Sequence, residues 1–410
     1  TIVVMCMAFM YRRFKLRPLY FAAAAFTLVG SVMGLFATSF ELLMAARLVQ
    51  AAGSGIFIPL MMNTVMVVVP KHKLGTFLSI GGCMITFGPA LAPTVCGALV
   101  TSAGWHSVFA VPLAAMAVLA LMALFAVKNM GFSPAHLDIP STVLSAAFLC
   151  ALSLGLVELT IDIPLAVGSL AVAVVMAALF VLRQLRCEHP LIDLTPMKSR
   201  AFWPSVVLTT IAMMGSFSMS VLLPLYLEGG TGLTAFAVGL LMLIPVLANA
   251  GTTLLGGRIM DTRGEWPLLP AGFAAIAAGF ALMAALAPTL SLPAAFVAAL
   301  LIMGGTGFIF SPSQTAGLRT LPAEMNPFGV AISTTFVQIA ACIGPSLYTG
   351  IMSTAQAGAL AAGAGEALAT AQGFSIAMVV AACIAAAGCA LALVYSRAAV
   401  KRDVKRAGSM

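Results

Sequence analysis

An arginine stands inside a long apolar stretch of this chain and is the first candidate for chemistry. Arg47 and Gln50 lie three positions apart, so a helix presents both side chains on one face. An arginine within a membrane span costs about 2.5–3.5 kcal/mol, so we expect it to face a bundle interior or a wet cavity. There it would bias a carboxylate or a polar substrate group during proton exchange. The structural alternative is that Arg47 bonds carbonyl groups and pins two helices together.

A second charged group lies between two later apolar stretches. Arg258, Asp261 and Arg263 precede Gly264 in what we expect to be a short turn. Charges of both signs there can pair with a neighbouring helix end, and such a latch would hold one access state and break in the other. The alternative is that these charges only determine the topology.

Glu158 lies close to one end of an apolar stretch, and a carboxylate in a membrane span is a proton-carrier candidate. Its stretch belongs to an inserted pair described below, which favours a structural role instead. The four histidines are scattered and the eight cysteines show no ligand spacing. The sequence therefore predicts no metal site, no cofactor and no enzymatic activity.

The elements that must position these residues follow from composition. The chain has 410 residues, of which 62% are hydrophobic and 8% charged, with a mean hydropathy of +1.11, which excludes a soluble globule. A spanning helix needs about 20 apolar residues, and all spans must be helical because lipid cannot satisfy an open backbone. The sequence predicts an apolar segment at 1–10 and then spans near 19–37, 42–69, 76–100, 108–127, 140–160, 164–182, 204–227, 235–256, 268–287, 294–313, 328–351 and 373–395.

The basic residues predict the orientation of these spans. Of the 20 Lys and Arg, all but Arg47 fall on alternate loops or on the C-terminal tail, which places those segments and the C-terminus in the cytoplasm. The net charge of +8 is thereby explained by topology and by contact with anionic lipid, and we expect no binding of nucleic acid.

The two halves of the chain contain similar segments about 250 residues apart. The second half begins with a full span that the first half lacks, so we expect the chain to lack its first helix and most of its second. The spans at 140–182 have no counterpart and are predicted to be an insertion. The expected segments are an N-terminal bundle at 1–127, the inserted pair and linker at 128–203, a C-terminal six-helix bundle at 204–396 and a basic tail at 397–410.

Four motifs resemble the major facilitator superfamily, in particular its 14-helix drug:proton antiporter branch. Residues 47–55 resemble the RxxQGxG pattern of the family's fourth helix, and 88–93 its GPxxGG antiporter motif. Residues 105–112 resemble the entry to the sixth helix, and 257–264 match the GxxxDxxG hinge. The first-half hinge departs from the pattern, since Tyr11 and Phe14 stand where the family has Asp and Gly.

The resemblance implies a proton-coupled antiporter of the inner or plasma membrane that exports hydrophobic or amphipathic compounds, including cations. It implies a monomer in which two bundles rock about a central cavity. Its partners would be such small molecules, protons and the lipid bilayer. The coupling residues would be Arg47 and Gln50, and Glu158 joins them as the carboxylate in a membrane span noted above. The gating residues would be Gly53, Gly88, Pro89, Pro93, Arg258, Asp261, Arg263, Gly264, Gly344 and Pro345. The cavity would include Asn63, Met213, Met214, Phe217, Asn249 and Gln338.

Two other functions stay open. One is a dedicated exporter or importer of a single metabolite, lipid or peptide. The other is a truncated membrane protein that does not transport, which the changed hinge at Tyr11 and Phe14 would favour.

Overall fold

The computed structural model describes the chain except residues 1, 2, 4–6, 8, 9, 12, 128–137, 159–161, 188, 189, 267 and 408–410. Side chains are also outside the described part at 86, 87, 89–94, 97, 98, 101, 139, 235 and 399–407. The described residues form helices and no strand. Within this part, eleven helices are long and apolar enough to cross a membrane. The prediction of an all-α polytopic membrane protein is confirmed.

The predicted spans all correspond to helices, although several helices run beyond the apolar stretch. In particular, α9 continues to Arg263, because nothing breaks it before Gly264 adopts a left-handed φ of +76°. The long helices are α2 (Leu16–Leu35), α3 (Phe40–Val68), α4 (Leu74–Ala103), α5 (Ala110–Ala126), α6 (Ile139–Glu158), α7 (Ile163–Arg186), α8 (Trp203–Thr231), α9 (Ala235–Arg263), α10 (Leu268–Leu286), α11 (Leu292–Leu318), α12 (Asn326–Ala361) and α13 (Glu366–Ala407).

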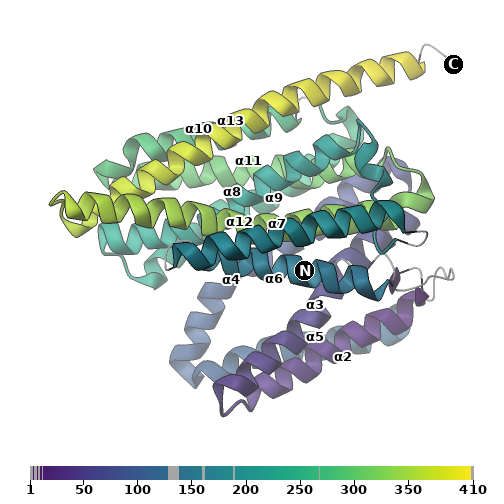
Figure 1. Ribbon diagram of the computed structural model, residues 1–410, viewed down its shortest axis with the longest axis horizontal. Helices are drawn as coiled ribbons and strands as arrows, with labels where there is room; N and C mark the ends of the chain where they lie inside the picture. Colours follow the sequence, from purple (N-terminus) through teal and green to yellow (C-terminus); the bar gives the residue numbers. More distant parts are fainter. Residues whose placement is uncertain are drawn as a thin grey trace.

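Helices α2, α3 and α5 pack together, and Figure 1 shows them as a group set apart from the other helices. Small residues allow the close approach of α2 to α3. A Cβ on Gly53 would lie 2.6 Å from the carbonyl oxygen of Ala23. Arg17 donates to the carbonyl of Leu124 at 3.2 Å and so ties the start of α2 to the end of α5.

Helices α8–α13 form the larger apolar core. Its members are buried side chains from all six helices, such as Met260 on α9, Phe273 on α10 and Phe374 on α13. Tyr226 of α8 stacks on Phe374 with ring centroids 4.3 Å apart and donates its hydroxyl to the carbonyl of Ala287. Burial of aromatic rings with a satisfied hydroxyl stabilises this part of the molecule.

Helix α4 joins the two groups, since it packs mainly along α9 and only sparsely against α3. Helices α6 and α7, which the sequence predicts to be an inserted pair, pack on each other, and α6 also contacts α12. Figure 1 shows this pair alongside α12. The predicted division of the chain at residues 127, 203 and 396 stays a prediction.

Candidate functional site

We call α2–α5 the first half and α8–α13 the second half, and polar contacts between them lie at the first turn of α4. The first amide groups of a helix have no partner within it, and α4 has Lys73 at its N-cap, whose side chain makes no capping bond. Asp261 of α9 supplies the missing acceptor. Its Oδ1 accepts the amide of Gly75 at 2.9 Å, and its Oδ2 accepts the amide and the hydroxyl of Thr76, each at 2.7 Å. A carboxylate from one half therefore caps a helix of the other.

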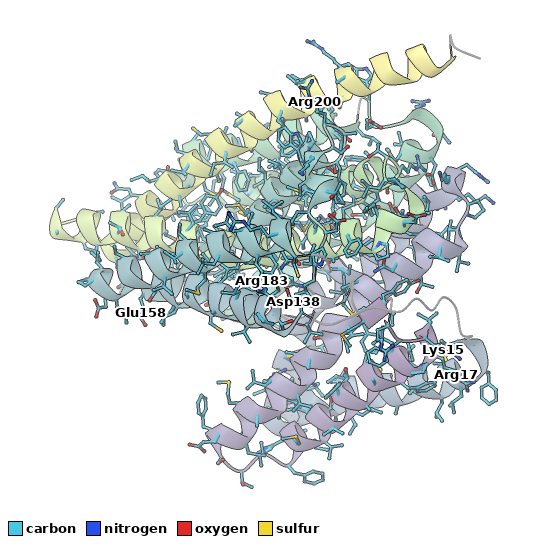
Figure 2. The ribbon with its side chains drawn as sticks, turned by 45° about the vertical axis from the view of Figure 1, so that its right-hand side comes forward. Lys15, Arg17, Asp138, Glu158, Arg183 and Arg200 are labelled. Atoms are coloured by element: carbon cyan, nitrogen blue, oxygen red, sulfur yellow. The ribbon has the colours of Figure 1, made fainter. Side chains whose placement is uncertain are left out.

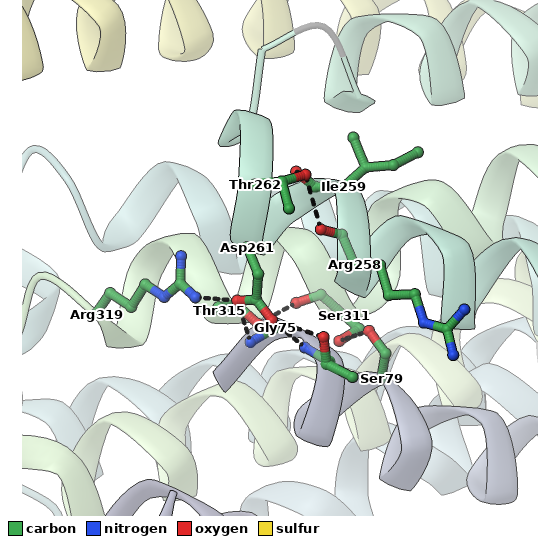
Figure 3. Close-up of polar contacts among 10 residues, drawn as sticks. Gly75, Ser79, Arg258, Ile259, Asp261, Thr262, Ser311, Thr315 and Arg319 are labelled. Carbon is green, nitrogen blue, oxygen red and sulfur yellow. Dashed lines mark hydrogen bonds and ion pairs between the residues drawn. The ribbon is translucent and has the colours of Figure 1, made fainter. Parts of the chain in front are cut away.

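Arg319, at the end of α11, completes this contact. It forms an ion pair with Asp261, and the two side chains are 24% and 8% exposed. Figure 3 shows Asp261 between the guanidinium of Arg319 and the backbone of Gly75. The carboxylate is thus held by a cation and by three hydrogen bonds from α4, which is the arrangement that compensates a nearly buried charge. We call Asp261, Arg319, Gly75 and Thr76 the latch.

One turn further along α4, the two halves approach still more closely. Ser79 donates to Ser311 of α11 at 2.7 Å. A Cβ on Gly75 would lie 2.7 Å from the carbonyl oxygen of Gly257, and a Cβ on Gly257 would collide with Ser79. Glycine at both positions therefore permits the backbone contact that brings Asp261 to the end of α4.

A buried apolar cluster lies at the same end of the helices. It contains Met62 of α3 and Leu78 of α4 together with Leu318 and Phe328 of the second half. Lys71, Arg183, Arg258 and Arg319 also lie at this end, which we call the basic end. The latch and the cluster together close the basic end in this structure.

The hinge residues predicted from sequence lie on the last turns of α9 and not in a separate turn. Of these, Asp261 makes the cross-half contacts, whereas Arg258 and Arg263 are exposed and Gly264 ends the helix. Figure 3 shows Arg258 pointing away from the latch. The cation that pairs with Asp261 is therefore Arg319 and neither of its neighbours in sequence.

Arg47 and Gln50 lie together on α3, as their spacing predicts. The guanidinium donates to Oε1 of Gln50 at 3.2 Å, and Gln50 donates to Oγ of Ser31 at 2.9 Å. The Arg47 guanidinium also lies 4.5 Å from the ring centroid of Phe109. The side chain is exposed and lines a pocket of about 290 Å³ with Phe40, Leu43, Met44, Trp105, Val108 and Phe109.

Glu158, the third predicted coupling residue, does not join this group. It is the last residue of α6 and is half-buried. Figure 2 shows it at the opposite end of the inserted pair from Asp138 and Arg183. The structure thus brings together two of the three predicted coupling residues.

The remaining predicted gating residues differ in their surroundings. Gly344 of α12 is buried, and a Cβ there would lie 2.7 Å from the carbonyl oxygen of Met214 on α8. Its neighbour Pro345 is half-buried within α12. Gly88 of α4 is exposed, with no described atom within 4 Å of a Cβ. The side chains of Pro89 and Pro93 lie outside the described residues.

The predicted cavity residues occupy three places. Met213, Met214 and Phe217 belong to one apolar cluster with Phe310 of α11 and Val337 of α12, and Gln338 follows Val337 as a half-buried residue. Asn249 donates to the carbonyl of Met303 at 2.7 Å within the second half. Asn63 is buried on α3. Only the α8 residues therefore share a cluster.

Sequence reasoning missed the partners of Asp261. In the sequence, Arg319 only helped to predict the orientation of the spans, and Ser79 and Ser311 belong to no recognisable motif. A signal was present at Lys73, because a helix start without Ser, Thr, Asp or Asn at the N-cap needs an acceptor from elsewhere. Within the described residues, no group of three His, Cys, Asp or Glu side chains could hold a metal ion.

Comparisons with known proteins agree with this architecture. The sequence model of the Major Facilitator Superfamily matches residues 1–345. The chain is 32% identical over 338 residues to the lincomycin resistance protein LmrB of Bacillus subtilis (strain 168), covering 81% of this chain and 70% of that protein.

Solved structures with the same fold include a human organic anion transporter, MFSD10 (TETRAN). It superimposes with a TM-score of 0.68 at 12% identity over 95% of this chain and 80% of that one. The proton:xylose symporter XylE, bound to 6-bromo-6-deoxy-D-glucose, gives a TM-score of 0.60 at 18% identity, with coverage of 93% and 82%. At these identities the likeness concerns the fold alone.

Proposed function

Because the chain belongs to the Major Facilitator Superfamily, we propose that it exports hydrophobic or amphipathic compounds, cations among them, in exchange for protons. The similarity to a lincomycin resistance protein supports drug-type substrates. The positions of the basic residues support a place in the cytoplasmic membrane, with the basic end and the C-terminus on the cytoplasmic side.

The observation that carries this proposal is the latch. Alternating access requires contacts between the halves that exist in one state and are lost in the other. Asp261 meets this requirement. It lies on α9 and pairs with Arg319 at the end of α11, both in the second half, whereas the donors Gly75 and Thr76 lie on α4 in the first half. When the basic end opens, the carboxylate must leave Gly75 and Thr76 while Arg319 can follow it.

Arg47 and Gln50 are the groups we assign to coupling. The chain of hydrogen bonds from Arg47 through Gln50 to Ser31 holds the guanidinium in a fixed place beside Phe109. A fixed positive charge at a pocket favours the ionised form of any carboxylate or anionic group that approaches it. Arg47 would thus promote proton release on one side of the cycle.

Dye and drug accumulation tests the proposal. Cells without their own efflux pumps would be loaded with a panel of fluorescent dyes and, separately, exposed to lincomycin. We expect expression of the protein to lower dye retention and raise lincomycin tolerance, and a protonophore to abolish both effects. Asp261→Asn should lose most of the activity, whereas Thr262→Ala, an exposed neighbour on α9, should retain it. Unchanged retention across the panel together with unchanged lincomycin tolerance would contradict multidrug export.

A further inference from the structure

A polar network fastens the inserted helices at the basic end, apart from the latch. The carboxylate of Asp138, 7% exposed, pairs with Arg183 through two bonds, from Nη2 at 2.9 Å and from Nε at 3.1 Å. Ser141 donates its hydroxyl to the same carboxylate. Figure 2 shows Asp138 and Arg183 together at one end of the pair.

Gln184 connects this network to residues 190–202, the described segment between α7 and α8, which we call the linker. Its Nε2 donates to Oγ of Ser141 at 2.6 Å, and its Oε1 accepts the backbone amide of Ile192 at 3.0 Å. The side chain is only 4% exposed. Because a buried amide without partners is costly, these two bonds strongly favour one position of the linker relative to α7.

The linker leads directly into the cluster that closes the basic end. Leu191 and Ile192 are 1% and 2% exposed, and both are members of the cluster that contains Met62 and Leu78 of the first half and Phe328 of the second. Phe180 of α7 belongs to the same cluster. The inserted pair is therefore part of the packing that closes the basic end.

We propose that the inserted pair clamps the closed gate, with Gln184 as the positioning residue that holds Ile192 in the cluster. Asp138, Arg183 and Ser141 orient Gln184, and the linker transmits that position to the seam between the halves. Loss of the clamp favours the state that is open at the basic end. The inference rests on the alternating-access part of the proposed function, but its test needs no transported substrate.

The test measures the distance across the basic end. The eight native cysteines would first be replaced. Spin labels would then be placed at Lys71 in the first half and at Glu324 in the second, both of which are exposed. Electron–electron double resonance on the purified protein gives the populations of short and long distances. For Gln184→Leu we expect the long-to-short ratio to rise about five-fold, because one closed-state hydrogen bond to the linker is lost.

Arg186→Ala is the matched control, since Arg186 lies two residues away on α7 and is exposed. It should leave the distance distribution unchanged. Asp138→Asn should also raise the long-to-short ratio, and it replaces Gln184→Leu as the test if that variant does not fold. A folded variant of either kind with the distribution of the unmodified protein would overturn the clamp. If the unmodified protein changes neither dye retention nor lincomycin tolerance while Gln184→Leu alters the distance distribution, the proposed substrate class is contradicted and the clamp stands.

Discussion

At the scale of single residues, Asp261 joins the two halves through several partners at once. Its two oxygens serve two amides and a hydroxyl of α4 and the guanidinium of Arg319. The same carboxylate therefore acts as a helix cap and as an ion-pair partner. A change at this position weakens both roles, whereas a change at Arg319 affects only the ion pair.

A double-mutant cycle separates the two roles. Asp261→Asn should lower the free energy of unfolding by about 1–3 kcal/mol, because a nearly buried acceptor loses its charge. Arg319→Gln should cost less, since the cap on α4 remains. The double variant should be more stable than the sum of the two single effects predicts, and additive effects would contradict a direct coupling. Denaturant unfolding in detergent measures all three.

Arg47 has two possible roles, and the substitution Arg47→Lys distinguishes them. Lysine keeps the charge but loses the planar contact with Phe109 and the geometry of the bond to Gln50. If Arg47 acts in coupling, proton-driven efflux should fall by about ten-fold with little change in thermal stability. If it only pins helices, the melting temperature should fall while the pH dependence of efflux stays the same. Phe109→Leu replaces the aromatic ring by an aliphatic side chain and leaves Arg47 in place, so it controls for loss of the ring contact alone.

At the scale of elements, the crossing of α4 and α9 depends on glycine. Gly257→Ala places a methyl group against Ser79 and the carbonyl oxygen of Gly75. We expect it to cost about 1–3 kcal/mol of stability, or to force the basic end open, because neither helix backbone can yield easily. Gly251→Ala on the same helix meets no described atom within 4 Å and should be neutral or slightly stabilising. Equal effects of both substitutions on the melting temperature and the spin-label distances would contradict a close crossing.

The inserted pair should respond to acid through Asp138. The hydrogen bond from Arg183 holds the pKa of this carboxyl below its usual range, against the smaller opposing effect of burial. The folded protein therefore binds this proton less tightly than the unfolded chain, so Asp138 stabilises the fold above about pH 3.9. This contribution falls as the pH drops below that value and is lost below the lowered pKa. Melting temperatures measured from pH 6 to the acid limit should fall less steeply for Asp138→Asn, and parallel curves would contradict the assignment.

The elements themselves were predictable from the sequence, but their contacts were not. Apolar length determines a span, so α2 to α13 follow from hydropathy to within a few residues except where a helix continues past its apolar part, as α9 does to Arg263. The pairing of Asp261 with Arg319 joins positions 58 residues apart. Whether these two side chains meet depends on how α9 packs against α11, which no local sequence pattern determines. The pairing of Asp138 with Arg183 depends in the same way on how α6 packs against α7.

At the scale of the whole molecule, basic residues gather at one end of the helices. α4 shows this within one helix, since Lys71 and Lys73 precede it and Ser102 lies close to its other end. We predict that Ser102→Cys reacts with a membrane-impermeant maleimide on intact cells, whereas Lys73→Cys reacts only after the membrane is opened. Each substitution would be made without the native cysteines. The reverse labelling pattern would invert the proposed orientation.

The cap on α4 makes two backbone amides reporters of opening at the basic end. The amide protons of Gly75 and Thr76 are held by a carboxylate of the opposite half, so they can exchange with solvent deuterium only when the halves separate at that end. Their exchange rate therefore counts openings of the basic end without any label or substrate. A compound that holds the protein closed would slow these two amides, and one that holds it open would release them.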